Sequence, residues 1–171
     1  MAVTTSALVE HFRWLRDNDF HPVSINQVVA AKNNGDALPA NPVLLSFDDG
    51  LVSTYTHVYP LLKLFNYPAV SSLVTDWVEG EKTIDYAGHQ RDRSSFVSWE
   101  QIREMQDSGL VEFASHSHSL HKGIMANPQG NTQPAAVSLT YSNGKYESRE
   151  DYTNRILTDL QTSSKIIARH T

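Results

Sequence analysis

The feature that most constrains this sequence is the alternation of three short apolar runs with two amphipathic segments. The apolar runs occupy residues 42–47, 68–74 and 110–114, and turn residues bound each of them, as they bound buried strands. Apolar residues recur at helical spacing in the two intervening segments, 51–67 and 98–106. Strands that alternate with helices form a parallel sheet with right-handed crossovers. We therefore expect an α/β fold.

Apolar spacing predicts three more helices outside this alternation. The first begins at Thr4, Thr5 or Ser6, and the second begins at Ser24 and ends at Gly35. The last helix spans residues 147–170. The apolar residues expected to face inward from the first two helices are Leu8, Phe12, Leu15, Ile25, Val28 and Val29. A short extended piece is expected between these two helices.

Local signals refine the central part of the chain. Pro60 interrupts the segment 51–67, so we expect a kink or two short helices there. Ser98 to Gln101 has the form of a capping box and predicts the start of the next helix. Residues 77–95 are polar and irregular, and we expect a long surface excursion. Residues 115–131 are expected to form a loop.

Composition bounds the protein class. The chain has 171 residues, 40% of them hydrophobic and 19% charged, which suits one domain with a normal core. A net charge of -5 argues against a nucleic-acid surface. There is no cysteine, so disulfides and thiolate metal sites are excluded. No apolar run is long enough to span a membrane, and Met1–Thr5 shows no signal peptide, so the protein is cytoplasmic or its start has been removed.

Two adjacent carboxylates, Asp48 and Asp49, stand where the first apolar run stops. The carboxyl ends of strands are where α/β folds build their sites. Two neighbouring acids repel unless a cation or a shared proton relieves them. The plain alternative is a solvated Asp-Asp-Gly turn.

A histidine cluster follows the third apolar run. His116 and His121 are five positions apart, a spacing that puts them on different faces of a helix or a strand, so we expect them to converge from a loop. Together with a carboxylate from the first strand, two imidazoles form a facial set suited to zinc, iron, cobalt or nickel. His118 with His121 is a rival pair, spaced for one helical face, and a solvated hydroxyl-rich loop is the alternative without metal.

Two adjacent aspartates allow a division of labour in a hydrolytic site. One carboxylate binds the cation, and its neighbour takes a proton from water whose pKa the cation lowers toward about 7. The cation also polarises the carbonyl under attack.

These residues resemble the polysaccharide deacetylase family (NodB-type, carbohydrate esterase family 4). Ser46-Phe47-Asp48-Asp49-Gly50 is similar to its first motif. The second motif has its outer histidines four apart, whereas here they are five apart, as in the branch of poly-β-1,6-N-acetylglucosamine deacetylases. The other stretches that resemble this branch are 58–63, 98–105, 108–112, 114–123 and 127–131.

The resemblance implies a role for each matched residue. Asp48 is implied to be the general base, and Asp49, His116 and His121 are implied to bind a divalent transition metal, zinc first, then nickel, cobalt or iron. His118 has no implied ligand role. The implied reaction is N-deacetylation of exported poly-β-1,6-N-acetylglucosamine in biofilm formation, at the periplasm or cell envelope.

The family fold is a distorted (β/α) barrel with parallel strands and crossover helices. We expect residues 1–171 to be one NodB-like domain, truncated at both ends, because the third motif and a histidine upstream of the first helix have no counterpart here. We also expect the truncated chain to associate with itself. The main alternative function is a catalytically incomplete, metal-containing glycan-binding fragment. A phosphatase of the haloacid dehalogenase type fits poorly, because its two aspartates lie two apart.

Overall fold

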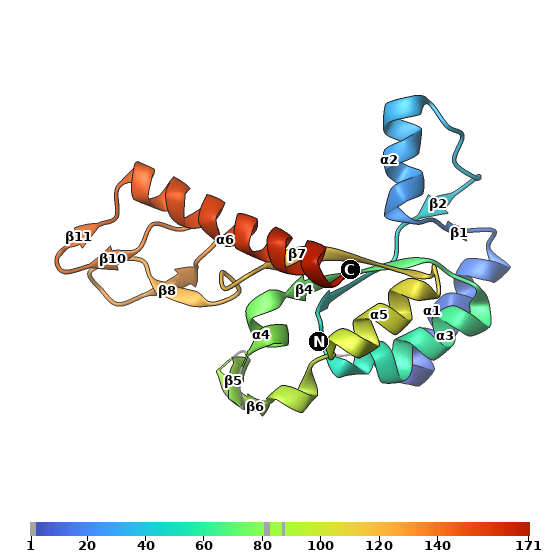
Figure 1. Ribbon diagram of the computed structural model, residues 1–171, viewed down its shortest axis with the longest axis horizontal. Coiled ribbons are helices and arrows are strands. Elements are labelled where there is room, and N and C mark those ends of the chain that lie inside the picture. Colours follow the sequence, from blue (N-terminus) through green and yellow to red (C-terminus); the bar gives the residue numbers. More distant parts are fainter. Residues whose placement is uncertain (1–2, 81–82, 87) are drawn as a thin grey trace. The chain divides into compact units, whose positions relative to one another are not determined.

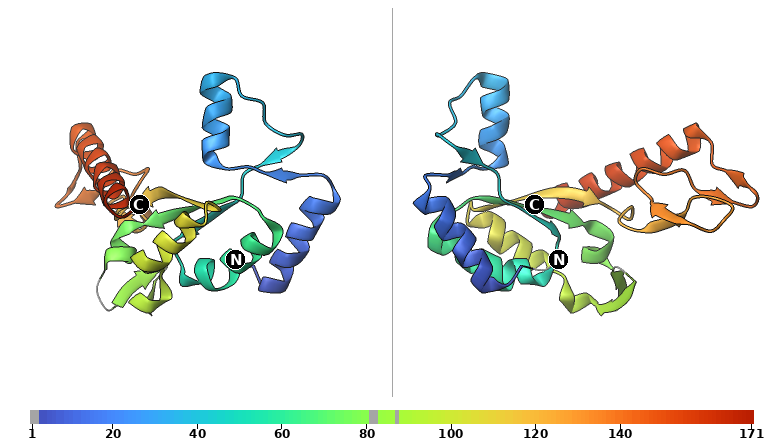
Figure 2. Two further views of the ribbon diagram at one scale, coloured as in Figure 1. Left: turned by 45° about the vertical axis from the view of Figure 1, so that its right-hand side comes forward. Right: turned by 180° about the vertical axis from the view of Figure 1, so that it is seen from behind.

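The computed structural model describes residues 3–80, 83–86 and 88–171, which fall into two compact units (Figures 1 and 2). The first unit holds residues up to Ser72, residues 94–114 and Thr171, and the second holds residues 73–93 and 115–170. The expectation for Met1–Thr5 rests partly on residues 1 and 2, which lie outside the described residues, as do residues 81, 82 and 87 of the expected excursion.

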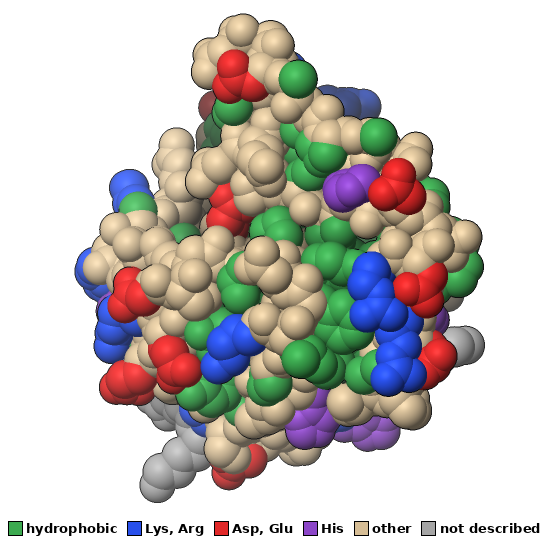
Figure 3. All heavy atoms as spheres, turned by 90° about the vertical axis from the view of Figure 1, so that its right-hand side faces the viewer, with side chains coloured by type: hydrophobic (Ala, Val, Ile, Leu, Met, Phe, Trp, Pro, Cys, Tyr) green, Lys and Arg blue, Asp and Glu red, His purple; other side chains and the backbone are tan. Residues whose placement is uncertain are grey.

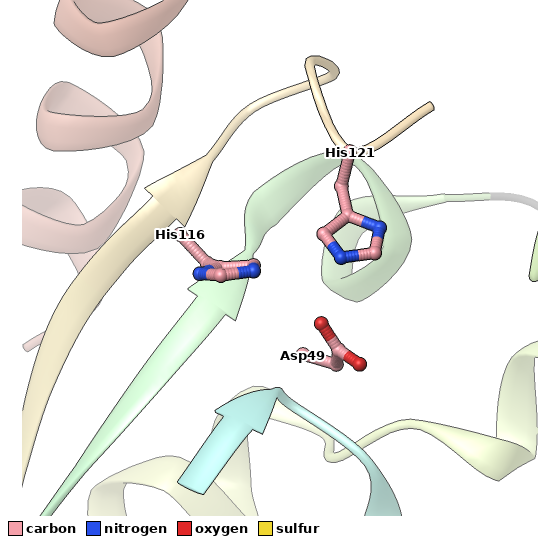
Figure 4. Close-up of side chains that lie close together, drawn as sticks. All are labelled: Asp49, His116 and His121. Atoms are coloured by element: carbon pink, nitrogen blue, oxygen red, sulfur yellow. The ribbon is translucent and has the colours of Figure 1, made fainter. Parts of the chain in front are cut away.

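A three-stranded sheet of order β3-β4-β7 organises the chain. Its strands are β3 (Ser46–Asp49), β4 (Ala69–Val74) and β7 (Val111–Ser117). The central strand β4 is buried along nearly its whole length, as strands covered on both faces are. The three arrows run the same way in Figure 4. The predicted α/β fold with parallel strands and crossover helices is therefore confirmed.

The first apolar run is not one strand, and this part of the prediction is wrong. Residues Pro42–Val43 form β2, which pairs in parallel with β1 (His21–Pro22). The chain then changes partners, because the carbonyl of Leu45 accepts a hydrogen bond from the N–H of Val70 at 2.9 Å. Strand β3 starts at Ser46 and includes both aspartates.

Two helices open the first unit, and both begin at a predicted cap. Helix α1 (Thr5–Asp17) is capped by Thr4, and helix α2 (Ile25–Asn34) carries a full capping box with Ser24 and Gln27. Phe12 of α1 is buried, as predicted. The inward orientation predicted for Val28 and Val29 is wrong, since they are 38% and 46% exposed and α2 contains no buried residue.

The crossover between β3 and β4 is interrupted, as predicted for Pro60. Residues Thr54–Val58 form a π-helical turn, and α3 (Tyr59–Phe65) follows with Pro60 in its first turn. Proline lacks the N–H that a continuous α-helix would need at that point. Helix α5 (Trp99–Asp107) begins with the predicted capping box at Ser98.

The core of the first unit lies among helices α1, α3 and α5. The ring centroid of Phe12 in α1 is 5.5 Å from that of Phe65 in α3. Ile102 and Met105 of α5 are fully buried. Helices α1, α3 and α5 lie side by side in both views of Figure 2.

The expected irregular excursion is wrong, because most of it is ordered in the second unit. Helix α4 (Thr75–Glu79) is followed by a hairpin of β5 (Thr83–Tyr86) and β6 (His89–Asp92), and Arg93–Ser95 forms a 3-10 turn. The Asp85 carboxylate accepts a hydrogen bond from the N–H of Gly88 at 3.0 Å, which closes the hairpin turn.

The rest of the second unit is a long helix flanked by short strands. Strands β8 (Gly123–Met125) and β9 (Thr132–Pro134) pair antiparallel, as do β10 (Tyr141–Ser142) and β11 (Lys145–Tyr146). The expected loop 115–131 therefore contains a strand. Helix α6 (Arg149–His170) buries Ile166 and Ile167.

Charged side chains of both signs lie on the face shown in Figure 3. Acidic and basic side chains are interspersed there among apolar ones. Within the described residues, no helix is both long enough and apolar enough to cross a membrane.

Candidate metal centre

The two aspartates that end strand β3 differ in burial. Asp48 is exposed whereas Asp49 is partly buried. Asp49 and Gly50 both have positive φ, 75° and 74°, so the backbone turns sharply at this point. The Gly50 carbonyl accepts a hydrogen bond from the N–H of Val97 at 2.9 Å, which anchors the turn.

Histidine 116 lies within strand β7, not in the loop that was predicted to carry both histidines. The strand runs to Ser117, three residues beyond the expected end at Ala114. His116 is partly buried. The sequence did not reveal this extension, because Ser115 to Ser117 is polar and lacks the apolar pattern of a buried strand.

Between the two outer histidines the chain leaves the strand through an unusual backbone conformation. Ser117 has a φ of 121°, a region that non-glycine residues rarely occupy. Such outliers persist only where the surroundings determine them, and they cluster at functional sites. The Ser117 hydroxyl accepts a hydrogen bond from the N–H of Leu120 at 3.2 Å and closes a tight turn that leads to His121.

The His121 ring lies in the second unit between two other rings. Its centroid is 5.0 Å from that of His116 and 5.1 Å from that of Trp77, whose plane is inclined at 70°. Trp77 in α4 was not singled out from the sequence. Only the position of the helix reveals that it packs beside a histidine.

Asp49, His116 and His121 form a cluster whose donor atoms face one another in Figure 4. One ligand atom from each lies within 4.8 Å of the other two. A carboxylate oxygen and two imidazole nitrogens are the donor set of many catalytic zinc and non-haem iron sites. The chemistry of these residues therefore fits a divalent transition metal.

The middle histidine is engaged elsewhere. The His118 Nδ1 and the Thr75 Oγ1 form a hydrogen bond of 3.0 Å, and the His118 carbonyl accepts a hydrogen bond from the N–H of Asp76 at 3.2 Å. His118 does not belong to the cluster found among the described residues. The rival pair of His118 with His121 therefore has no support from the geometry.

A cavity of about 1040 Å³ adjoins His116 and His121 within the second unit. Trp77, Asp76, Asp85 and Lys122 are among its lining residues. Cavities that hold small ligands have this size and combine apolar walls with a few polar groups.

The carboxylate and the two imidazoles lie near the strand ends of an α/β sheet. This arrangement places the chain in the class of α/β proteins with a candidate hydrolytic metal centre. Residues 35–129 match the family model for polysaccharide deacetylase. The chain belongs to the polysaccharide deacetylase family.

Individual relatives agree with this assignment. The poly-beta-1,6-N-acetyl-D-glucosamine N-deacetylase of Escherichia coli K12 is 43% identical over 163 residues, which are 93% of this chain and 24% of the relative. A solved de-N-acetylase from Aggregatibacter actinomycetemcomitans has a TM-score of 0.94 at 45% identity, over 98% of this chain and 65% of that one. The BpsB deacetylase domain from Bordetella bronchiseptica has a TM-score of 0.91 at 47% identity, over 96% and 64%. The chain thus spans about a quarter of the length of the E. coli relative.

Proposed function

We propose that this chain carries the metal centre of an N-deacetylase that acts on poly-β-1,6-N-acetylglucosamine. The observation that carries the proposal is the cluster of Asp49, His116 and His121 in a member of the polysaccharide deacetylase family. The name of the E. coli relative supports the choice of glycan. Because such a polymer is exported for biofilm formation, the proposed location is the periplasm or cell envelope.

Asp49, His116 and His121 are the proposed ligands. Their mixed nitrogen and oxygen donors suit zinc, and they also suit nickel, cobalt or iron. When bound, the cation supplies Lewis acidity toward the acetamide carbonyl and toward water. The protein contributes a site in which each ligand is fixed by its own element: Asp49 by the end of β3, His116 by β7 and His121 by the turn after it.

Asp48 is the proposed general base. It neighbours Asp49 at the end of β3 and is exposed, and it is not among the three residues of the cluster. An ionised carboxylate can take the proton of the water that attacks the amide carbon. The amide C–N bond then breaks and acetate leaves, while both protons of the water pass to the sugar nitrogen, which becomes an ammonium group and leaves Asp48 ionised again.

The cavity beside the histidines is the proposed place for a sugar ring. Trp77 offers an aromatic surface, and Asp76, Asp85 and Lys122 offer polar groups for hydroxyl and amide hydrogen bonds. An N-acetylated glucosamine unit presents both kinds of surface.

The first prediction tests the base. Asp48→Asn removes the ionisable group with little change in shape, so we expect the fold and the metal content to persist. Deacetylation is expected to fall by about 10²- to 10⁴-fold, the usual contribution of a general base. The readout is the acetate released from poly-β-1,6-N-acetylglucosamine oligomers. The assay uses a complete enzyme that contains residues 1–171. Near-normal acetate release by the variant would rule out the role.

The alternative is a metal-containing segment that binds the glycan without turnover. The observation that favours it is that the proposed base, Asp48, does not belong to the cluster found among the described residues. The same oligomers distinguish the two functions: binding without acetate release by this chain supports the alternative, and metal-dependent acetate release supports the deacetylase.

A further inference from the structure

Asp159 is an acid buried on helix α6, a place where carboxylates are rare. Its residue surface is only 8% exposed. One carboxylate oxygen, Oδ1, accepts a hydrogen bond from the N–H of His118 at 2.7 Å, and the other, Oδ2, accepts one from the N–H of Ser119 at 2.7 Å. Burying a carboxylate costs free energy unless hydrogen-bond donors reach it. Asp159 therefore needs the two N–H groups of the loop, and these N–H groups have Asp159 as their acceptor.

The segment that Asp159 holds is the link between the two outer histidines. It begins at Ser117, whose φ of 121° must be imposed by the surroundings. One turn along α6, the Ser163 hydroxyl accepts a hydrogen bond from the Ser115 hydroxyl at 2.7 Å. Helix α6 is therefore hydrogen-bonded to the chain just before His116 and again between His116 and His121.

A carboxylate matches two successive N–H groups because each of its two oxygens accepts one of the bonds. A carboxylate has two oxygens in a fork, whereas an amide has one oxygen and a nitrogen that donates. The two N–H groups fix the orientation of two consecutive peptide planes. The direction in which the chain reaches His121 follows from them.

We propose that Asp159 is a positioning residue, which sets the distance and orientation between His116 and His121 by holding the backbone of His118 and Ser119. Asp159 acts through the loop and not by contact with substrate or cation. The inference rests on the proposed metal centre, because it assigns Asp159 a role in forming that centre.

The variant Asp159→Asn tests this role, since it keeps the size of the side chain and removes one acceptor. The probe is cobalt(II), titrated into the purified chain and followed by its visible absorption. We expect the cobalt affinity to fall by about 10- to 100-fold, the usual effect of losing a partner that orients a ligand. Amide exchange at His118 and Ser119 is expected to accelerate in the same variant.

Ile166→Val is the matched control. Ile166 is buried on the same helix, but the change touches neither the carboxylate nor the loop backbone. We expect this variant to lose some stability and to keep its cobalt affinity. An equal loss of affinity in both variants would show that α6 acts only through general packing, and would overturn the proposal.

Two further outcomes separate this inference from the proposed function. If Asp159→Asn folds and binds cobalt as tightly as the unchanged chain, the positioning role is wrong and the metal centre stands. If the unchanged chain binds no cobalt, the metal centre itself is wrong, and the role falls with it. Should the variant fail to fold, the unchanged chain still decides: unprotected amides at His118 and Ser119 would overturn the role, and protected ones support it.

Discussion

Among single residues, His118 has a different role from His116 and His121, because its ring is hydrogen-bonded to Thr75. The ring is held by Thr75, and the backbone by Asp76 and Asp159. His116 and His121 instead lie in the cluster with Asp49. Three histidines within six positions thus divide into two candidate ligands and one residue that fixes the loop.

We therefore predict opposite effects for substitutions in this short segment. His116→Ala or His121→Ala removes a proposed ligand and should cut cobalt or zinc content sharply. His118→Ala should keep the metal and cost about 0.5–1.5 kcal/mol of unfolding free energy for the lost hydrogen bond to Thr75. Elemental analysis and urea denaturation measure the two quantities. A metal-free His118→Ala protein with intact His116 and His121 would contradict the assignment.

The candidate site could be predicted from the sequence where its residues stand at a change of pattern. Asp49 and His121 follow apolar runs, so the sequence could predict that they lie near strand ends. Asp159 was not found, although a signal exists: it occupies a buried position on the same helix as Ile166 and Ile167, where a carboxylate requires donors. Those donors are backbone N–H groups of a distant loop, which no sequence pattern displays.

For secondary-structure elements, the pattern of prediction and error has a physical cause. The starts of the capped helices were predicted correctly, because Ser24 and Ser98 make hydrogen bonds to residues only three positions further along the chain. The hairpin β5–β6 was missed, because β6 is exposed throughout and its residues show no apolar alternation. Strand pairing there comes from the backbone and from the turn at Gly88.

One ion pair ties the segment before α6 to that helix. Arg155 donates to Glu147 at 2.9 Å and to the carbonyls of Ala135 and Ser138 at 2.9 and 3.0 Å. Glu147 also accepts a hydrogen bond from the N–H of Thr140 at 2.6 Å. The hydrogen bond from Arg155 is the main cause that lowers the pKa of Glu147 from 4.5 to about 2.

A pH dependence of stability follows from this lowered pKa. A carboxyl group whose folded pKa lies below its unfolded value stabilises the fold above the unfolded value, here 4.5. That stabilisation is lost as the pH falls from about 4.5 toward about 2. Glu147→Gln should therefore lower the unfolding free energy by about 2 kcal/mol at pH 7 and by much less at pH 2.5, as measured by urea denaturation. Glu150→Gln, at an exposed acid in the first turn of α6, serves as the control, and an equal effect of Glu147→Gln at both pH values would contradict the linkage.

For the molecule as a whole, an apolar strip on α6 remains accessible. Leu157 and Leu160 are 51% and 45% exposed on this helix. Ile166 and Ile167, further along the same helix, are buried. Large accessible apolar side chains close together favour association.

We predict that two copies of this chain associate through that strip. Leu157→Glu with Leu160→Glu places charges in the contact and should shift the chain toward the monomer. Sedimentation velocity over a range of concentrations measures the shift, and Leu64→Glu, at an exposed residue of α3, is the matched control. A monomeric unchanged chain at high concentration would contradict the prediction.

The order of the sheet β3-β4-β7 also has a kinetic consequence. The bond between the N–H of Ala69 and the carbonyl of Leu110 forms only after the whole intervening crossover has closed. Closing a long loop costs entropy before any ladder bond repays it, so parallel pairing is slow. During that delay the apolar strand β4 stays uncovered, and this is the interval in which a nascent or refolding chain is most exposed to aggregation.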